Sequence, residues 1–323
     1  MTAVIAGLKS STSKRKANDV SEIRKGVVIG GGTMGADIAA IFAAHGCAVE
    51  IVEHAAQSRS SLGERIETAV AELGCAGRKG AVAVRPSIQE VDWAEASIVI
   101  ECVFESLPVK KEVFAQLEQF APATIPLASN SSGFPITRIS EGLATRHRML
   151  GLHFFMPGHL VPAVEVIRGE HTDEAFVEQA YALMARLGKK PVRVKRDVPG
   201  FLANRIQHAM MREAISLVEQ GFASAEDVDT VVRYGFGMRY VAAGPLLQKD
   251  LAGIDIHCAA AGTMYPYLCN DAEPSQMMQQ LVADGNIGVK AKKGFYDWSD
   301  AAIERERRRY KEALAKALDI LKA

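Results

Sequence analysis

VVIGGGTMG, residues Val27–Gly35, is the stretch that decides the fold of this chain. Gly30, Gly32 and Gly35 have the spacing G-x-G-x-x-G, between an apolar β-branched run and the helical pattern of residues 36–44. A strand that turns into a helix through such glycines presents backbone N–H groups and the positive helix end to a pyrophosphate. Gly30 allows the tight turn, Gly32 the approach of the phosphates, and Gly35 close packing of helix on strand. The stretch therefore predicts dinucleotide binding.

The second half of this motif is an acid at the end of the next predicted strand. Residues 49–52 are β-branched or apolar apart from Glu50, and Glu53 follows them, 18 residues after Gly35. This spacing is close to that of the carboxylate that binds a ribose 2′-hydroxyl. A carboxylate there repels a 2′-phosphate, so the sequence predicts NAD rather than NADP. The alternative is a glycine-rich surface turn followed by an ordinary acid.

The bulk composition is that of an ordinary globular protein, with 323 residues, 48% hydrophobic and 24% charged. Its 38 basic and 38 acidic residues cancel, which argues against nucleic acid or a membrane surface as a partner. No apolar run approaches the roughly 18–20 residues that span a bilayer. The five cysteines are scattered without a C-x-x-C pair, which predicts reduced thiols in a cytoplasmic protein and no metal site.

Residues 1–24 are polar and precede the first predicted strand. Lys14, Arg15 and Lys16 are adjacent, as in a targeting signal, but Asp19 and Glu22 interrupt the basic bias. We expect a disordered leader, with a targeting signal as the alternative.

Residues 25–196 alternate between strand-like and helix-like patterns, which predicts an α/β domain with a doubly wound parallel sheet of the Rossmann type. The cofactor is expected at the carboxyl ends of its strands. The expected strands are Val27–Ile29, Val49–Val52, Ser97–Ile100, Ile125–Ala128, Met149–Leu152, Ala163–Ile167 and Val192–Val194. The expected helices between them are Ala36–Ala44, Ser60–Leu73 and Lys110–Phe120.

The pattern changes after Arg196, and residues 197–323 predict a second, all-helical domain. Phe201–Gln220 has apolar residues every three or four positions. Ser224-x-x-Asp227 is typical of a helix start, and we expect a helix over residues 224–234. Asp300–Lys322 is rich in charge with one apolar stripe, which predicts a helix docked on its own domain or on a partner subunit.

The best candidate for a catalytic group is His153, at the end of one predicted strand. Glu165 follows twelve residues later in the next strand, after a loop that contains Pro157, Gly158 and Pro162. If the strands fold back on each other, a carboxylate contacts the imidazole, fixes its tautomer and raises its basicity. Such a pair suits removal of a hydroxyl proton during hydride transfer. Spacing alone leaves a structural histidine and an unrelated buried acid equally open.

Two further polar groups are candidates for positioning a substrate. Ser129–Gly133 (SNSSG) follows a predicted strand, so its hydroxyls either orient an alcohol or cap the next helix, and the residues alone favour the cap. Asn204 lies on the first helix after the domain break. Its amide either points into an interdomain cleft or lies on the helix surface.

Together these motifs resemble the L-3-hydroxyacyl-CoA dehydrogenase family, from about Lys25 to Trp298. The motifs occur in the family's order: GGGTMG, Phe104-Glu105 with Lys110-Lys111, Ser129-Asn-Ser-Ser132, His153-Phe-Phe, Glu165, Asp197-Val-Pro-Gly-Phe201 with Asn204-Arg205, and Gly294-Phe-Tyr-Asp297.

The resemblance implies a role for each matching residue. His153 is then the catalytic base, Glu165 its carboxylate partner, and Ser132 and Asn204 contact the reacting hydroxyl and the substrate carbonyl region. Relatives dimerise through the helical domain, which implies a homodimer. The residues implied to bind NAD are Gly30, Gly32, Thr33, Met34, Gly35, Glu53, Glu105, Lys110 and Asn130, with Glu105 and Lys110 on the nicotinamide side.

The chain also departs from the family's usual pattern. Met156 stands where the family's HFFNP motif has Asn, and Gly158–Pro162 (GHLVP) resembles relatives that act on CoA-free substrates, such as carnitine, gulonate and pyridine-carboxylate dehydrogenases. Lys79 is the only lysine between Glu53 and Glu105, where fatty-acid enzymes carry lysines toward CoA. Arg59, Arg65 and Arg78 are the other basic candidates there.

His159, in the altered loop, is either a substrate contact or, as we expect, a solvated loop histidine.

The predicted function is NAD-dependent interconversion of a 3-hydroxyacyl substrate and its 3-oxoacyl product. The first candidate substrate is a CoA thioester of fatty-acid metabolism. The alternatives are the same chemistry on a small CoA-free β-hydroxy acid, and a non-catalytic NAD-binding protein.

Overall fold

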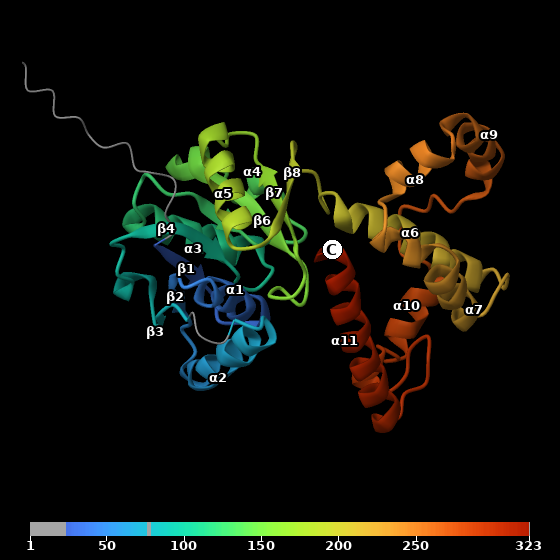
Figure 1. The fold of residues 1–323 in the computed structure, drawn as a ribbon, viewed down its shortest axis with the longest axis horizontal. Coiled ribbons are helices and arrows are strands. Elements are labelled where there is room, and N and C mark those ends of the chain that lie inside the picture. Colours follow the sequence, from blue (N-terminus) through green and yellow to red (C-terminus); the bar gives the residue numbers. More distant parts are fainter. Residues whose placement is uncertain (1–23, 76–78, 323) are drawn as a thin grey trace, which may run out of the picture. The chain divides into compact units, whose positions relative to one another are not determined.

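The structure, a computed structural model, describes residues 24–75 and 79–322. Apart from Arg24, the predicted leader therefore lies outside the described residues. These residues divide into two compact units that meet in the sequence between Arg205 and Ile206 (Figure 1). The boundary predicted at 196/197 lies shortly before this point and stays a prediction. Within the described ranges, no helix is both long and apolar enough to cross a membrane.

An eight-stranded sheet forms the centre of the first unit, in the order β3-β2-β1-β4-β5-β6-β7-β8. Strands β1 to β6 run parallel to their neighbours, and every residue of the central strand β1 is buried. The strands are β1 Lys25–Ile29, β2 Ala48–Val52, β3 Val82–Arg85, β4 Ala96–Glu101, β5 Leu127–Ser129, β6 Met149–Phe154, β7 Ala163–Arg168 and β8 Lys190–Val194.

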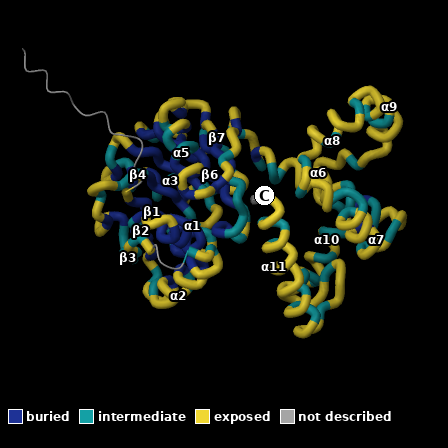
Figure 2. The backbone as a smooth tube through the Cα atoms, in the orientation of Figure 1, coloured by how far each residue is buried: buried dark blue, intermediate teal, exposed yellow. Residues whose placement is uncertain are grey.

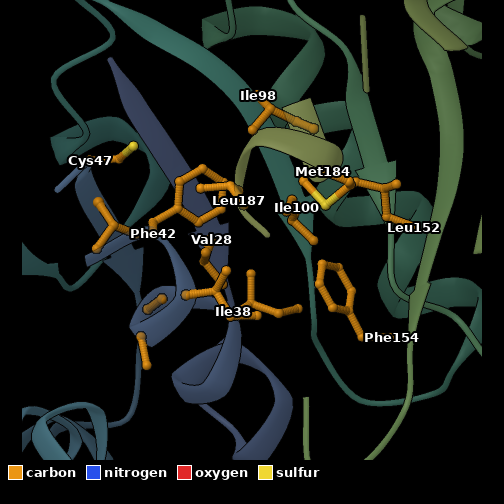
Figure 3. Close-up of a cluster of buried hydrophobic side chains, with 14 of the residues drawn as sticks. Val28, Ile38, Phe42, Cys47, Ile98, Ile100, Leu152, Phe154, Met184 and Leu187 are labelled. Carbon is orange, nitrogen blue, oxygen red and sulfur yellow. The ribbon is translucent and has the colours of Figure 1, made fainter. Parts of the chain in front are cut away.

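The helices of the first unit cover both faces of this sheet. They are α1 Thr33–Ala44, α2 Ala56–Glu72, α3 Leu107–Phe120, α4 Ile136–Ile139 and α5 Glu174–Arg186. Val28 joins one buried cluster with side chains of α1, α2 and α5, whereas its neighbours Val27 and Ile29 join a second cluster with α3 and α4. Figure 3 shows part of the first cluster, in which Ile38 and Phe42 of α1 lie beside Val28. The predicted doubly wound fold is therefore confirmed.

Two features of the sheet differ from the prediction. Strand β3 was not predicted, because its four half-buried residues give too short a pattern to stand out. Strand β7 runs antiparallel to β6, so the sheet is mostly rather than wholly parallel. A short loop joins these two strands, and only an antiparallel hairpin can be closed by a short loop.

The glycines of the first turn have distinct structural roles. Gly30 has a φ of +104°, which side chains rarely allow. A methyl group on Gly35 would lie 1.9 Å from the carbonyl oxygen of Gly30, so this position must be bare for helix α1 to pack on β1. At Gly32 a methyl group would meet no atom within 4 Å and would project into open space.

The second unit is helical among its described residues, with no strand beyond two isolated bridges. Its helices are α6 Ala203–Glu219, which begins in the first unit, α7 Ala225–Thr230, α8 Pro245–Ala252, α9 Ile254–Met264, α10 Gln276–Ala283 and α11 Asp300–Lys322. Ser224 caps α7 by accepting a hydrogen bond from the N–H of Asp227, as predicted. The helix expected to reach residue 234 continues past α7 as a π-helical turn, Val231–Phe236.

Burial differs sharply between the two units (Figure 2). From residue 206 onward the described chain has three buried residues, Ile215, Ser216 and Val228. Large apolar side chains such as Leu246 and Tyr267 are more than 80% exposed there. By itself the helical unit therefore leaves much of its apolar surface uncovered.

Candidate active site

The turn between β1 and α1 has the geometry of an anion site. Gly32 caps a helix of 12 residues, and no side chain bonds to the cap. The N–H groups at this helix end therefore remain available to an anion. Because a methyl group on Gly32 would project into open space, the backbone here is bare toward solvent, as the phosphates of a dinucleotide require.

Glu53 lies beside this turn, as the spacing predicted. One carboxylate oxygen accepts a hydrogen bond from the N–H of Gly31 at 2.9 Å, and the other accepts from the N–H of Ala55 at 2.8 Å. The side chain is largely buried. Two backbone donors thus hold a negative charge next to the glycines, where it favours a ribose hydroxyl over a 2′-phosphate.

The hairpin of β6 and β7 brings His153 and Glu165 together. They are partners in the strand register, and Nδ1 of His153 lies 2.8 Å from Oε2 of Glu165. Both residues are at most 3% exposed. The twelve-residue spacing predicted this contact only if the strands fold back, and they do.

Glu165 is held as a carboxylate by a second pair of donors. Its other oxygen, Oε1, accepts hydrogen bonds from the N–H groups of Leu202 and Ala203, both at 2.9 Å, where helix α6 begins. Burial raises the pKa of Glu165, but its bonds to His153 and to these two N–H groups outweigh burial and lower the pKa overall. Glu165 therefore stays charged and orients the imidazole with Nδ1 as the donor.

The second nitrogen of His153 faces a serine hydroxyl. Nε2 lies 3.1 Å from Oγ of Ser132. The rings of Phe155 and Phe201 flank the imidazole, with centroids 4.7 and 5.7 Å away. With Nδ1 donating to Glu165, Nε2 carries no proton and can accept one from a neighbouring hydroxyl.

Glu105 organises the loop that carries Ser132. Its Oε1 accepts hydrogen bonds from the hydroxyl of Ser131 and from the N–H groups of Ser132 and Gly133, at 2.5, 3.2 and 3.0 Å. The cap favoured from the sequence is wrong, because Pro135 precedes helix α4 and no side chain of residues 129–133 caps it. The backbone here bonds back to Glu105 instead.

Lys110 lies behind this loop in a buried ion pair. Its ammonium is 2.9 Å from Oε1 of Glu101 and 3.2 Å from Oε2 of Glu105, and Lys110 is 1% exposed. Glu101 is fully buried and also accepts a hydrogen bond from the hydroxyl of Ser129 at 2.6 Å. In this structure the ammonium of Lys110 pairs with the carboxylates of Glu101 and Glu105.

Two asparagines complete the surroundings of the serine loop. The amide oxygen of Asn130 accepts a hydrogen bond from the N–H of Phe154 at 2.9 Å, which ties the loop to β6. Asn204 donates its amide N–H to the carbonyl of Ser132 at 3.2 Å. The structure thus brings four predicted residues, His153, Glu165, Ser132 and Asn204, into one connected network.

Two residues of the β6–β7 loop have very different surroundings. Met156 is 67% exposed. His159 was expected to be a solvated loop histidine, and this is wrong: it is 8% exposed and lies between Asp37 and Glu72. Both carboxylates are about 90 to 120 positions away in the chain, so no local pattern reveals them.

Sequence reasoning missed two supporting acids. Glu101 ends strand β4 and was not singled out, although an acid at the end of an otherwise apolar strand is a usable signal. Asp197 was noted only as part of a motif. Its carboxylate accepts a hydrogen bond from the N–H of Thr137 at 2.6 Å and so satisfies the start of helix α4.

Two family models match the chain. Residues 25–198 match the NAD binding domain of 3-hydroxyacyl-CoA dehydrogenase, and residues 200–298 match the C-terminal domain of the same enzyme. The NAD prediction is thereby confirmed. Within the described ranges, no group of three His, Cys, Asp or Glu residues is placed to hold a metal ion.

Individual relatives cover nearly the whole chain. 5-Formyl-3-hydroxy-2-methylpyridine 4-carboxylate 5-dehydrogenase of Mesorhizobium japonicum is 32% identical over 92% of this chain and 99% of its own. The human mitochondrial hydroxyacyl-coenzyme A dehydrogenase is 33% identical over 90% and 95%. A crystal structure of the pyridine-carboxylate enzyme, described as an NAD⁺ dependent dismutase, matches with a TM-score of 0.86 at 31% identity, over 94% of this chain and 99% of that one. The chain belongs to the 3-hydroxyacyl-CoA dehydrogenase family.

Proposed function

We propose that this protein is an NAD-dependent dehydrogenase that interconverts a 3-hydroxyacyl substrate and its 3-oxoacyl product. The observation that carries the proposal is the chain of contacts from Glu165 through both nitrogens of His153 to Ser132, at 2.8 and 3.1 Å. A protein that only binds NAD has no need of a histidine with a carboxylate on one nitrogen and a hydroxyl on the other.

The residues of the first turn fit the cofactor. Gly30, Gly32, Thr33, Met34 and Gly35 would hold the pyrophosphate, and Glu53 would bind the adenosine ribose. Glu105, Lys110 and Asn130 would support the nicotinamide side, with Lys110 acting through Glu105 because it is buried. When bound, NAD supplies the hydride acceptor for alcohol oxidation.

The network gives each protein group a task in that oxidation. Nε2 of His153 accepts the proton of the substrate hydroxyl, which Ser132 orients. Glu165 is charged before this step, so it stabilises the imidazolium that forms. Asn204 donates to the carbonyl of Ser132 and so holds the serine loop in place. In the reverse direction the imidazolium returns the proton to the alkoxide.

The substrate's acyl group is either bound to CoA or free. A CoA thioester of fatty-acid metabolism is the first, following the family. Specific contacts favour a CoA-free acid: Lys79 bonds to Glu67 at 2.7 Å, Arg59 to the carbonyls of Glu53 and His54, and Arg65 to the carbonyl of Gly31. Each of these basic side chains already bonds a protein group, and Arg78 lies outside the described residues. The relative that acts on a pyridine carboxylate agrees with this candidate.

A parallel assay tests the function and separates the candidates. NADH oxidation is followed with acetoacetyl-CoA and with free 3-oxo acids, for the wild type and His153→Gln. We expect turnover on at least one class, reduced about 10²- to 10⁴-fold by the substitution, with NADH binding preserved. Binding of NADH without turnover on either class would support the non-catalytic alternative. His171→Gln, at an exposed position, is the matched control.

We further propose that two copies assemble through the helical unit. The exposed apolar side chains of that unit include Leu246, Leu251, Ile254, Ile256 and Tyr267, at 62–87% exposure. They lie on α8, α9 and the turn that follows α9, and exposed apolar side chains that gather in one part of a protein are typical of an association site. Light scattering of the wild type should give twice the chain mass, and Leu251→Glu should shift it toward the monomer. A monomeric wild type would reject the assembly.

The cysteines support a proposal about the compartment. All five, Cys47, Cys75, Cys102, Cys258 and Cys269, are free thiols. Unpaired cysteines suit a reducing compartment such as the cytoplasm.

A further inference from the structure

A group of four titratable residues, three of them buried, lies outside the network around His153. His159 has Nδ1 3.2 Å from Oδ1 of Asp37 on α1 and Nε2 2.8 Å from Oε2 of Glu72 on α2. Asp37 and His159 are each 8% exposed. One imidazole in the β6–β7 loop thus bridges carboxylates from two helices, and none of these groups has a task in the reaction proposed above.

Lys189, the fourth member, anchors the same loop from the other side. It lies between α5 and β8, is 6% exposed, and donates hydrogen bonds to three backbone carbonyls of the loop. These are the carbonyls of Gly158, His159 and Val161, at 2.7, 3.0 and 2.9 Å. An ammonium has three donors, so every one is used on this loop.

The loop is in direct contact with the helix that follows the nucleotide turn. The N–H of Gly158 donates to Oδ2 of Asp37 at 2.7 Å. A methyl group on Gly158 would lie 3.0 Å from Cε of Met34 and 3.1 Å from Cβ of Asp37. Loop and helix therefore pack closely at Gly158, and a side chain there would have to displace Met34 or Asp37 by a few tenths of an ångström.

The charges of the group favour a fixed arrangement. Burial lowers the pKa of His159, but its hydrogen bond to Glu72 and its close contact with Asp37 outweigh burial, so the net pKa lies above the ordinary value. Burial lowers the pKa of Lys189 to about 8, against the attraction of Asp37. The raised pKa favours protonation of His159 between its two acidic neighbours, and the loss of either neighbour removes that stabilisation.

We propose that Asp37, Glu72, His159 and Lys189 form a positioning cluster that fixes the loop of residues 157–162 against helix α1. The loop joins the strand that ends near His153 to the strand that carries Glu165. By anchoring this loop, the cluster would fix the position of His153 relative to the turn between β1 and α1. The role in catalysis rests on the proposed function, whereas the anchoring of the loop does not.

Two variants test the cluster, each removing one cation without adding bulk: His159→Gln and Lys189→Met. We expect kcat to fall about 10- to 100-fold, because displacing a catalytic group by about 1 Å costs a factor of this size. KM for the oxo substrate should change less than kcat. Backbone amides of residues 158–161 should exchange with deuterium faster, while amides of strand β1 remain protected.

Two control variants keep the outcomes distinct. His171→Gln removes an exposed histidine. Glu178→Gln changes helix α5, which precedes Lys189, and breaks the exposed ion pair of Glu178 with Arg193 of β8. Both should behave as wild type. The cluster is refuted if both test variants fold, keep kcat within about threefold of the wild type and leave loop exchange unchanged. If either unfolds globally, Glu72→Gln provides the same readouts from the most exposed member.

The failure of the proposed function looks different. In that case the wild type turns over no β-oxo substrate, and hydrogen exchange alone measures the cluster. Faster loop exchange in His159→Gln would then still support anchoring, and unchanged exchange would overturn it.

Discussion

Replacing Glu165 by glutamine tests the core of the proposed chemistry with almost no change of shape. The carboxylate accepts three hydrogen bonds, one from Nδ1 of His153 and two from the N–H groups of Leu202 and Ala203. A glutamine amide has one oxygen and one NH₂ group. Whichever way it turns, the NH₂ group faces a donor, either the imidazole or the start of helix α6.

The expected loss follows from the two jobs of the carboxylate. If the NH₂ group faces His153, Nδ1 must become an acceptor, so Nε2 carries the proton and can no longer accept one from a substrate. In either orientation the negative charge that stabilises the imidazolium is gone. In Ser-His-Asp proteases, replacing the aspartate that orients the catalytic histidine by a neutral amide lowers kcat by up to about 10⁴-fold. We therefore expect a fall of about 10²- to 10⁴-fold, or roughly 2.7–5.5 kcal/mol of activation free energy.

Steady-state kinetics of NADH oxidation with a β-oxo substrate measures this loss, and the fluorescence of bound NADH measures cofactor affinity separately. The affinity should change little, since Glu165 does not contact the nucleotide turn. If the NH₂ group faces α6, the N–H groups of Leu202 and Ala203 lose their acceptor, and each loss should lower the free energy of unfolding by about 1–3 kcal/mol. A folded Glu165→Gln protein with kcat within about threefold of the wild type would refute the role of the pair.

The second and third glycines of the motif should respond differently to alanine. Gly35→Ala places a methyl group 1.9 Å from the carbonyl oxygen of Gly30 and should prevent normal folding, whereas Gly32→Ala should keep the wild-type Tm but bind NADH weakly. Thermal unfolding and fluorescence titration measure these two effects. Glu53→Ala should lower the preference for NAD over NADP by about tenfold or more, measured as the ratio of kcat/KM values, and an unchanged ratio would remove Glu53 from the ribose site. Because the pKa of His159 is raised on folding, its contribution to stability is complete below the unfolded pKa of about 6.5 and is lost as pH rises through the folded pKa. The difference in unfolding free energy between wild type and His159→Gln should therefore shrink from pH 6 to pH 9 in urea titrations, and a constant difference would contradict a charged His159.

Much of the first unit could be predicted because its signals are local. The strand at Val27–Ile29, the turn glycines and the acid at Glu53 lie close together in the sequence, and periodicity suffices to find them. Asp300–Lys322 was predicted with the bounds that helix α11 has, because its single apolar stripe and flanking polar residues are equally local. The family resemblance then supplied the order of motifs that no single pattern provides.

Other parts depend on contacts between distant residues, which periodicity does not reveal. The direction of β7 follows from how a loop closes, and the burial of His159 follows from carboxylates on two other helices. The ion pair of Lys110 with Glu101 was not predicted, because Glu101 belongs to the preceding strand and no local pattern joins the two residues. The serines of residues 129–133 suggested a helix cap because Glu105, their actual partner, belongs to a different connection of the sheet.

The contrast between Gly32 and Gly35 has an evolutionary consequence. The protein's own packing requires a bare backbone at Gly35, whereas at Gly32, where a methyl group would meet no atom within 4 Å, only the proposed nucleotide would require it. A related protein that keeps this fold but no longer binds NAD could therefore carry a side chain at the position of Gly32, but not at that of Gly35. A residue other than glycine at the position of Gly32, with glycine kept at that of Gly35, would therefore mark family members that have lost the cofactor and with it the activity.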